Sequence, residues 1–269
     1  MTQTPNTQAV VTCEVNDGVA QVRLNRPEKM NALNGEMFEQ LVAVGQDLIT
    51  RTDISAVVLA GEGRAFCAGL DMAEFERMAS GAEAVVVERP RLGAAAALAQ
   101  QAVHVWSLVP VPVIAAVHGV AFGGGLQLAL GADIRIVGPD AKLSVMEIVW
   151  GLIPDMTGTQ LLPELVGRDV AKELVFTGRQ ITGTEAVAMG LATRMNLNPV
   201  VAATALATEI AGNSRNALVH AKALLDLAGR TDLAAGFDAE QVAIRELIGS
   251  PEQIAVVRER QEALARNKK

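Results

Sequence analysis

The chain has 269 residues, half of them hydrophobic, which is enough for one large domain with a substantial apolar core. Its formal net charge of −7 argues against nucleic-acid binding, because an acidic surface repels phosphate backbones. Two cysteines, Cys13 and Cys67, are too few for a disulfide framework. Residues 1–9 contain no apolar signal core, and no apolar run approaches the roughly 20 residues that span a bilayer. We therefore expect a cytoplasmic protein without membrane association.

The first part of the chain alternates short strands with helices. Two β-rich runs, residues 10–15 and 19–24, flank Asp17-Gly18, which is a strong hairpin signal. An amphipathic helix over residues 35–51 and an apolar strand over residues 54–59 follow. A helical stretch over residues 83–108, broken by Pro90, is predicted next. A strand over 113–117 and a glycine run lead into a short helix that ends at residue 130. Strands over 133–137 and 143–145 follow.

From Gly158 onward the pattern is helical throughout. The alternation before that point predicts βα crossover units and an α/β fold. We expect a core over residues 1–200 and a C-terminal helical region over residues 201–269 that packs on the core or on a neighbouring chain. The predicted helices cover 159–166, 169–177, 184–189, 200–211, 217–228, 232–247 and 251–266.

Three segments occur in order: LNRPEKMNAL (24–33), RAFCAGLDM (64–72), and HGVAFGGG (118–125), the last continuing through ADIR (132–135) to GTQ (158–160). Together they resemble the crotonase (enoyl-CoA hydratase/isomerase) superfamily. The resemblance implies a spiral of ββα units with a C-terminal helical trimerisation region. It also implies an acyl-CoA substrate, a homotrimer or dimer of trimers, and neither a metal nor a separate cofactor.

The glycine run Gly123–Gly125 suits an oxyanion hole, because backbone N–H groups approach a ligand closely only where side chains are absent. The helix that follows would direct the positive end of its dipole toward the charge. The resemblance implies that the two donors are the amides of Ala68 and Gly124. The alternative is that the glycines serve only tight packing.

The catalytic side chains depart from the family pattern. Hydratases of the family use two glutamates, and the corresponding positions here hold Gln127 and Glu147. An amide cannot transfer protons as a carboxyl group does, whereas one carboxylate is enough to move a proton between two carbons. Asp155 matches the position at which dienoyl-CoA isomerases of the family carry a second acid; the alternative is that Asp155 caps the helix that begins near residue 157.

The resemblance also indicates a CoA-binding surface, with Arg26 and Lys29 as candidates for the phosphates. Asp71 fits a helix N-cap better than a catalytic acid. Cys67 is expected to be a small core residue, and Trp150 either lines the acyl pocket or packs in the core. The complete CoA-side set is Arg26, Lys29, Ala65, Phe66, Ala68, Asp71 and Met72.

The sequence leaves several functions open. The leading hypothesis is a double-bond isomerase for enoyl-CoA or dienoyl-CoA that uses Glu147. The alternatives are an enoyl-CoA hydratase in which Glu147 works alone or with water held by Gln127, and a non-catalytic acyl-CoA binding protein. A Clp-type serine peptidase is excluded, because no serine follows the glycine run and no Ser-His-Asp set is evident.

Overall fold

The computed structural model describes residues 9–80 and 88–266. It confirms the predicted N-terminal hairpin, in which β1 (Val11–Asn16) pairs antiparallel with β2 (Val19–Leu24). The turn residues Asp17 and Gly18 both have positive φ, of 49° and 76°, as two-residue hairpin turns require.

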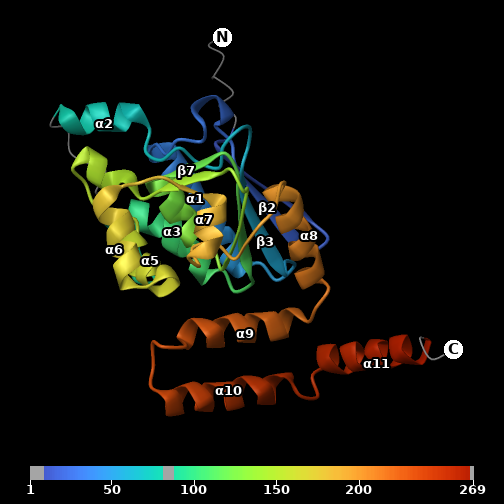
Figure 1. Cartoon of the computed structure of the whole chain (residues 1–269). Coiled ribbons are helices and arrows are strands. Elements are labelled where there is room, and N and C mark those ends of the chain that lie inside the picture. Colours follow the sequence, from blue (N-terminus) through green and yellow to red (C-terminus); the bar gives the residue numbers. More distant parts are fainter. Residues whose placement is uncertain (1–8, 81–87, 267–269) are drawn as a thin grey trace, which may run out of the picture.

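The hairpin opens a six-stranded sheet with the order β1-β2-β3-β6-β8-β11. Every pairing after the first is parallel, so helical crossovers connect most of its strands, as predicted for an α/β fold (Figure 1). The further strands are β3 (Ala56–Gly61), β6 (Val113–Val117), β8 (Ile134–Val137) and β11 (Arg194–Met195).

Both faces of this sheet are buried. In β3, Val57 and Leu59 belong to the larger apolar core, which includes residues of α1 (Gly35–Thr50) and α3 (Leu98–Leu108). The alternate residues Val58 and Ala60 belong to a second core beneath α8 (Pro199–Ala211). Successive side chains of a strand point to opposite faces, so burial of both faces explains the uninterrupted apolar sequence of β3.

Two smaller sheets complete the strands. A three-stranded sheet has the order β10-β9-β7, and β4 pairs with β5 in a hairpin. These strands are β7 (Val120–Phe122), β9 (Lys142–Ser144), β10 (Ile181–Thr182), β4 (Glu88–Leu92) and β5 (Ala95–Ala97). The remaining elements are the 3₁₀ helices η1 (Pro27–Lys29) and η2 (Met146–Trp150), with α2 (Met72–Ala79), α4 (Gly124–Leu130), α5 (Gly158–Val166), α6 (Arg168–Thr177) and α7 (Gly183–Ala188).

Two predictions of secondary structure are wrong. The helical stretch expected over residues 83–108 is a helix only from Leu98, because residues 88–97 form the β4–β5 hairpin; the start of that stretch lies outside the described residues. Pro90 lacks an N–H and disfavours helix before it. The segment after Gly158 also includes β10 and β11, whose two residues each are too short to show a period.

The C-terminal helices α9 (Arg215–Leu227), α10 (Leu233–Leu247) and α11 (Pro251–Arg266) lie below the body in Figure 1. Because α8 packs across the six-stranded sheet, the packed core continues past the predicted division at residue 200 to Ala211. Among the helices described, none is long and apolar enough to cross a membrane.

Helix α9 is bound to the body by two cations. Arg215 donates to the carbonyl oxygens of Ile54 and Arg51, at 2.7 and 2.9 Å. Lys222 is buried, and its Nζ lies 2.7 Å from Asp133 Oδ2. The same Asp133 oxygen accepts the Val113 N–H at 2.7 Å. These contacts make α9 part of the main body.

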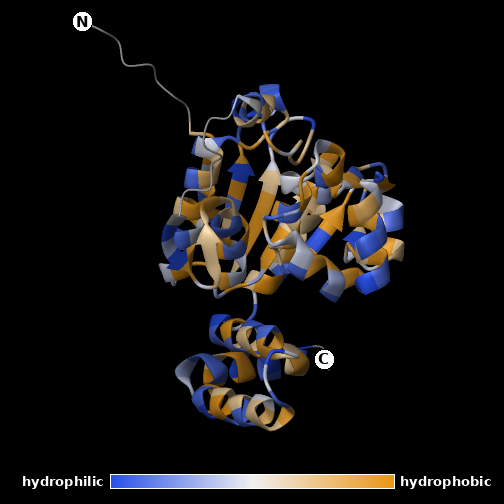
Figure 2. Cartoon of the chain, turned by 90° about the vertical axis from the view of Figure 1, so that its left-hand side faces the viewer, coloured by the Kyte–Doolittle hydropathy of each residue, from blue (hydrophilic) through white to orange (hydrophobic). Residues whose placement is uncertain are grey.

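Helices α10 and α11 carry many exposed apolar side chains. In Figure 2, hydrophobic and hydrophilic segments alternate along the ribbons of the helices at the bottom of the view. Such a density of exposed large apolar side chains is unusual for a monomer and is typical of a face that another chain covers. The exposed residues are Leu233, Phe237, Val242, Ile244, Ile248, Ile254, Val256, Val257 and Leu264.

Candidate active site

Asn31 holds together the loops that begin the site. It is fully buried, with a positive φ of 57°. Its Oδ1 accepts the Arg26 N–H at 2.9 Å, and its Nδ2 donates to the carbonyl oxygens of Glu62 and Ala65, at 2.9 and 2.8 Å. One side chain therefore ties the loop after β2 to the loop after β3.

The backbone amide of Ala68 is already occupied. It donates to the Met30 carbonyl oxygen at 2.9 Å, so the prediction that Ala68 supplies an oxyanion donor is wrong. Leu70, two residues later, has an N–H without an acceptor in the described part of the chain. The carbonyl of Gly69 and the N–H of Asp71 on either side both bond to Leu33, at 2.7 and 2.8 Å, which fixes the direction of the Leu70 amide.

Gly124 offers a second backbone amide that has no acceptor among the residues described. It is the first residue of α4, so its N–H has no partner within the helix. A Cβ on Gly124 would lie 2.7 Å from Met156 Sδ and 3.0 Å from Leu33 Cδ1, and one on Gly69 would lie 2.6 Å from the Phe122 carbonyl oxygen. The glycines therefore do serve tight packing, which places the loop before Leu70 against the turn before Gly124. An oxyanion hole requires two such amides from neighbouring segments.

Glu147 and Gln127 meet beside these amides. Gln127 lies on α4 and Glu147 on η2, and Gln127 Nε2 donates to Glu147 Oε1 at 2.6 Å. A Cβ on Gly123 would lie only 3.3 Å from Glu147 Oε1. The carboxyl group therefore lies against the glycine turn, and its other oxygen, Oε2, is buried without a hydrogen-bond partner.

The surroundings of Glu147 shift the pKa of its carboxyl group upward. Burial raises its pKa, because a carboxylate loses hydration there. Its own backbone N–H and the Gln127 amide lower the pKa in part, while the negative charge of Asp155 raises it further. A carboxyl group with a raised pKa and a free oxygen is suited to taking up and returning a proton.

Gln127 is fixed on both sides. Its side chain is 1% exposed, and its Oε1 accepts the backbone N–H groups of Met156 and Gly158, at 2.9 and 3.0 Å. Its Nε2 is directed to Glu147. The amide oxygen is therefore occupied by the loop before α5, and the side chain orients Glu147.

Asp155 does not cap α5. The N-cap residue of that helix is Thr157, with a φ of 75° and no side-chain cap bond, so the capping alternative for Asp155 is wrong. Asp155 is exposed as a whole, but partial desolvation of its carboxyl group raises its pKa. It lines a cavity of about 640 Å³ together with Ile153, Pro154 and Thr157.

Arg26 and Asp71 form an ion pair. Arg26 Nη2 lies 2.9 Å from Asp71 Oδ2, and its Nη1 donates to the Ala32 carbonyl oxygen. Asp71 also accepts the Ala73 N–H at 3.2 Å as the N-cap of α2, which confirms the predicted cap. Burial alone would raise the pKa of Asp71, but the Ala73 N–H and the guanidinium hold it below its usual range. Arg26 is thus neutralised internally, contrary to the role predicted for it.

The other candidates for CoA binding differ in the exposure of their side chains. Lys29 and Met72 are exposed, whereas Ala65 and Phe66 are buried, so these two can offer a ligand only their backbone. Cys67 is buried as predicted, and its thiol donates to the Asn31 carbonyl oxygen. Burial raises the pKa of that thiol to about 12, which leaves it unreactive.

Trp150 is not a core residue. It is 48% exposed and stacks on Phe75 of α2, with ring centroids 4.6 Å apart and an interplanar angle of 28°. This stack connects α2, which follows Leu70, to η2, which carries Glu147.

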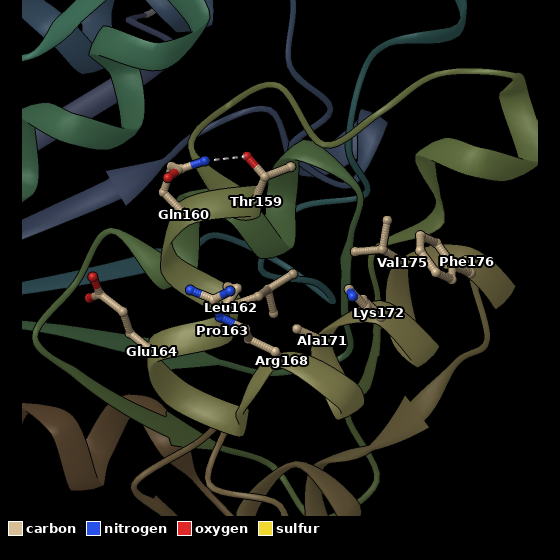
Figure 3. A pocket seen from close by; sticks show the side chains of 10 residues that line it. All are labelled: Thr159, Gln160, Leu162, Pro163, Glu164, Arg168, Ala171, Lys172, Val175 and Phe176. Atoms are coloured by element: carbon tan, nitrogen blue, oxygen red, sulfur yellow. Dashed lines mark hydrogen bonds between the residues drawn. The ribbon is translucent and has the colours of Figure 1, made fainter.

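A cavity of about 660 Å³ lies away from these groups, between α5 and α6 (Figure 3). Leu162, Ala171 and Val175 form part of its wall, with Arg168 and Lys172 beside them. None of the predicted site residues lines it.

The sequence reasoning missed four residues of the site. Leu70 lies in a motif that was recognised, but only the hydrogen bonds distinguish its amide from that of Ala68. Asn31 also lies in a recognised motif, and its burial is a tertiary property. Met156 and Phe75 gave no sequence signal, because ordinary helices and loops contain such residues at many positions.

Comparison with known proteins identifies the family of the chain. The family described as enoyl-CoA hydratase/isomerase matches residues 14–259. The Mus musculus protein named enoyl-CoA hydratase domain-containing protein 2, mitochondrial, is 34% identical over 263 residues, which cover 94% of this chain and 85% of that protein.

Two solved structures share the fold. The enoyl-CoA hydratase of Bacillus anthracis is 29% identical with a TM-score of 0.84, and the match covers 94% of this chain and 96% of that one. A Thermobifida fusca protein solved in complex with CoA is 31% identical with a TM-score of 0.75, over 94% of this chain and 95% of that one. The chain therefore belongs to the enoyl-CoA hydratase/isomerase family of the crotonase superfamily, and it is an enzyme.

Proposed function

We propose that the protein is an acyl-CoA double-bond isomerase in which Glu147 is the proton-transfer group. One observation carries the proposal: Gln127, a neutral amide, holds Glu147 at 2.6 Å in the place where a second carboxyl group would allow the paired-acid chemistry of a hydratase. The thioester oxygen would bind the free amides of Leu70 and Gly124. An oxyanion donor of this kind typically contributes about 2.7–4 kcal/mol to transition-state stabilisation.

The reaction follows from one carboxylate and two donors. With a 3-enoyl-CoA, Glu147 removes a proton from C2, and the electrons of that C–H bond move onto the thioester oxygen as an enolate. The enolate collapses, the double bond shifts to C2–C3, and the protonated Glu147 returns the proton to C4. The same group acts as base and then as acid, so no net proton or water is consumed.

Asp155 would extend this chemistry to a conjugated diene. Its charge acts on Glu147, and both carboxyl groups have raised pKa values. One of them can remove a proton while the other supplies one at a more distant carbon. If Asp155 has this role, Asp155→Asn slows 3,5-dienoyl-CoA isomerisation selectively and leaves 3-enoyl-CoA isomerisation near the wild-type rate.

The CoA phosphates would meet Lys29 and Arg64. Both side chains are exposed, and neither has an ion pair within the described ranges. A Cβ on Gly63 would lie 2.8 Å from Pro27 Cβ, which brings the loops that carry the two cations into contact. Arg26 instead forms an ion pair with Asp71 and donates to the Ala32 carbonyl oxygen, so its role is to stabilise the loop.

We further propose a homotrimer or a dimer of trimers. The support is the family membership together with the exposed apolar side chains of α10 and α11, which a further copy of the chain would cover.

The decisive experiment is incubation with 3-enoyl-CoA, 3,5-dienoyl-CoA and crotonyl-CoA, followed by absorbance and mass. An isomerase converts the first or the second without a change of mass. The alternative, an enoyl-CoA hydratase, adds the mass of water to crotonyl-CoA. A non-catalytic acyl-CoA binding protein changes none of them. Rapid hydration together with no isomerisation would refute the proposal.

A further inference from the structure

We propose that Phe75 and Trp150 form the acyl-specificity wall of the site, against which the chain beyond the reacting carbons lies. The wall would favour acyl chains that extend well past the reacting carbons over chains of four carbons. This inference rests on the proposed acyl-CoA site, and the test below separates the two.

The position of Trp150 follows from the geometry of η2. Side chains three residues apart in a 3₁₀ helix point in the same direction, one turn or about 6 Å apart. Trp150 lies three positions after Glu147 in η2. The indole therefore lies one turn beyond the catalytic carboxyl group, on the same side of the helix.

The position of Phe75 follows from the other side of the site. Asp71 is the N-cap of α2 and directly follows Leu70, whose amide faces the thioester oxygen in the proposed complex. Phe75 comes four residues after the cap, about one helical turn of 5.4 Å along α2. Each ring is thus one turn from one of the two groups that hold the reacting atoms.

The stack closes the space between these two helices. The ring centroids are 4.6 Å apart, which leaves no room for a chain between the rings. Trp150 is nevertheless 48% exposed, and Met72, on the first turn of α2, is 55% exposed. In the proposed complex, these surfaces offer an apolar contact to the part of an acyl chain that extends beyond Glu147.

A longer acyl chain would cover more of the exposed indole surface, so the wall discriminates by chain length. The Phe75 ring fixes the orientation of that surface, since stacked rings restrict each other.

The test measures binding of saturated acyl-CoA thioesters of four to ten carbons by calorimetry, because these compounds bind without reacting. Trp150→Ala is expected to weaken binding of the eight- and ten-carbon compounds about tenfold, the factor that 1.4 kcal/mol represents. Butyryl-CoA should bind within about twofold of wild type. Trp150→Phe should restore most of the loss, and Phe75→Ala should flatten the dependence on chain length in the same way as Trp150→Ala.

Phe176→Ala is the matched control, because Phe176 is 68% exposed on α6 and lies outside this site. It should bind every compound as wild type does. An equal loss for all chain lengths in Trp150→Ala, or an unchanged length dependence, would overturn the wall. If wild type binds the whole series but isomerises no enoyl-CoA, the proposed function fails while the wall stands.

Discussion

Gln127 Nε2 donates to Glu147 Oε1 at 2.6 Å, and Gln127 Oε1 accepts two backbone N–H groups from the loop before α5. The amide cannot rotate without breaking these bonds. Glu147 is therefore held in one orientation, with its second oxygen, Oε2, left without a partner. A proton-transfer group that is fixed in this way reaches only carbons close to Oε2, which suits a shuttle between neighbouring positions of one chain.

Replacing Glu147 with Gln should abolish turnover and leave binding intact. Gln keeps the shape and can still accept from Gln127, but it cannot carry a proton. General-base removal typically costs about 10²–10⁴-fold in rate. Single-turnover rates with 3-enoyl-CoA and calorimetry with a saturated acyl-CoA measure the two effects. A fully active Glu147→Gln variant would refute the assignment of the base.

Gln127→Glu tests the amide. One oxygen of the new carboxylate would keep the Met156 and Gly158 N–H groups, and the other would face Glu147 Oε1. Two carboxylates at this separation raise the pKa of one of them. Because activity requires ionised Glu147, the acid limb of kcat/KM should move to higher pH. Water addition to crotonyl-CoA should also rise above the wild-type level.

The control for this variant is Gln127→Met, which removes the donor without adding a charge. Loss of the Gln127 hydrogen bond also raises the pKa of Glu147, because that bond stabilises the carboxylate. Its acid limb should move upward too, but hydration should not increase. If the pH profiles of wild type and both variants coincide, Gln127 does not act on Glu147.

Gly124→Ala should lower kcat about 10²–10³-fold, the cost of losing one oxyanion donor. The added Cβ would lie 2.7 Å from Met156 Sδ, so the turn and its amide must shift. Met156→Ala in the same chain makes room for the Cβ and should recover part of the rate. Stopped-flow kinetics with 3-enoyl-CoA measures both, and a Gly124→Ala variant with the wild-type rate would exclude this amide as a donor.

Arg26→Met should destabilise the fold. The Arg26 and Asp71 side chains are 14% and 11% exposed, and removing one partner of such a pair costs about 3–5 kcal/mol of unfolding free energy. In wild type this contribution is present above the ordinary Asp pKa of about 3.9 and is lost as the pH falls through the depressed pKa of Asp71. Urea titration at several pH values measures it.

Lys29→Met gives the contrasting result. Its side chain is exposed, so the unfolding free energy should remain near that of wild type while KM for acyl-CoA rises. If Arg26→Met raises KM without any loss of stability, Arg26 contacts the substrate after all.

The apolar faces of α10 and α11 predict the state of assembly. Light scattering should give three or six times the 28.2 kDa of one chain. Phe237→Glu, together with Ile248→Glu, places charges on that surface and should reduce the mass. A stable wild-type monomer at micromolar concentration would refute the trimer.

The sequence predicted the strands and helices that depend on local pattern. The hairpin at Asp17-Gly18, the buried strand β3 and the long helices each have a periodic or turn signal, and the structure confirms them. The β4–β5 hairpin was not predicted, because its alanines favour a helix and only tertiary contacts make this segment a hairpin. Strands of two residues, such as Arg194–Met195, carry no period at all.

In the site, too, residues within motifs were predicted, whereas contacts that depend on tertiary structure were not. Gln127 and Glu147 were predicted from their positions in motifs, and the structure brings them together. Ala68 was expected to supply a donor amide, but every residue in that segment has an N–H, and the one without an acceptor in the described residues is that of Leu70. Which amide remains free depends on Met30 and Leu33, from another loop. The charge of Arg26 is likewise decided by Asp71, 45 residues away.

The ion pair between Lys222 and Asp133 limits how early the chain can reach its final stability during synthesis. Asp133 is made 89 residues before its cation, and Lys222 also donates to the carbonyl oxygens of Trp106 and Val111. A nascent chain that stops before α9 leaves this carboxylate without its buried partner. The ion pair between Asp133 and Lys222 can therefore form only near the end of synthesis. Truncation before residue 222 removes this pair and should lower the free energy of unfolding of the remaining chain.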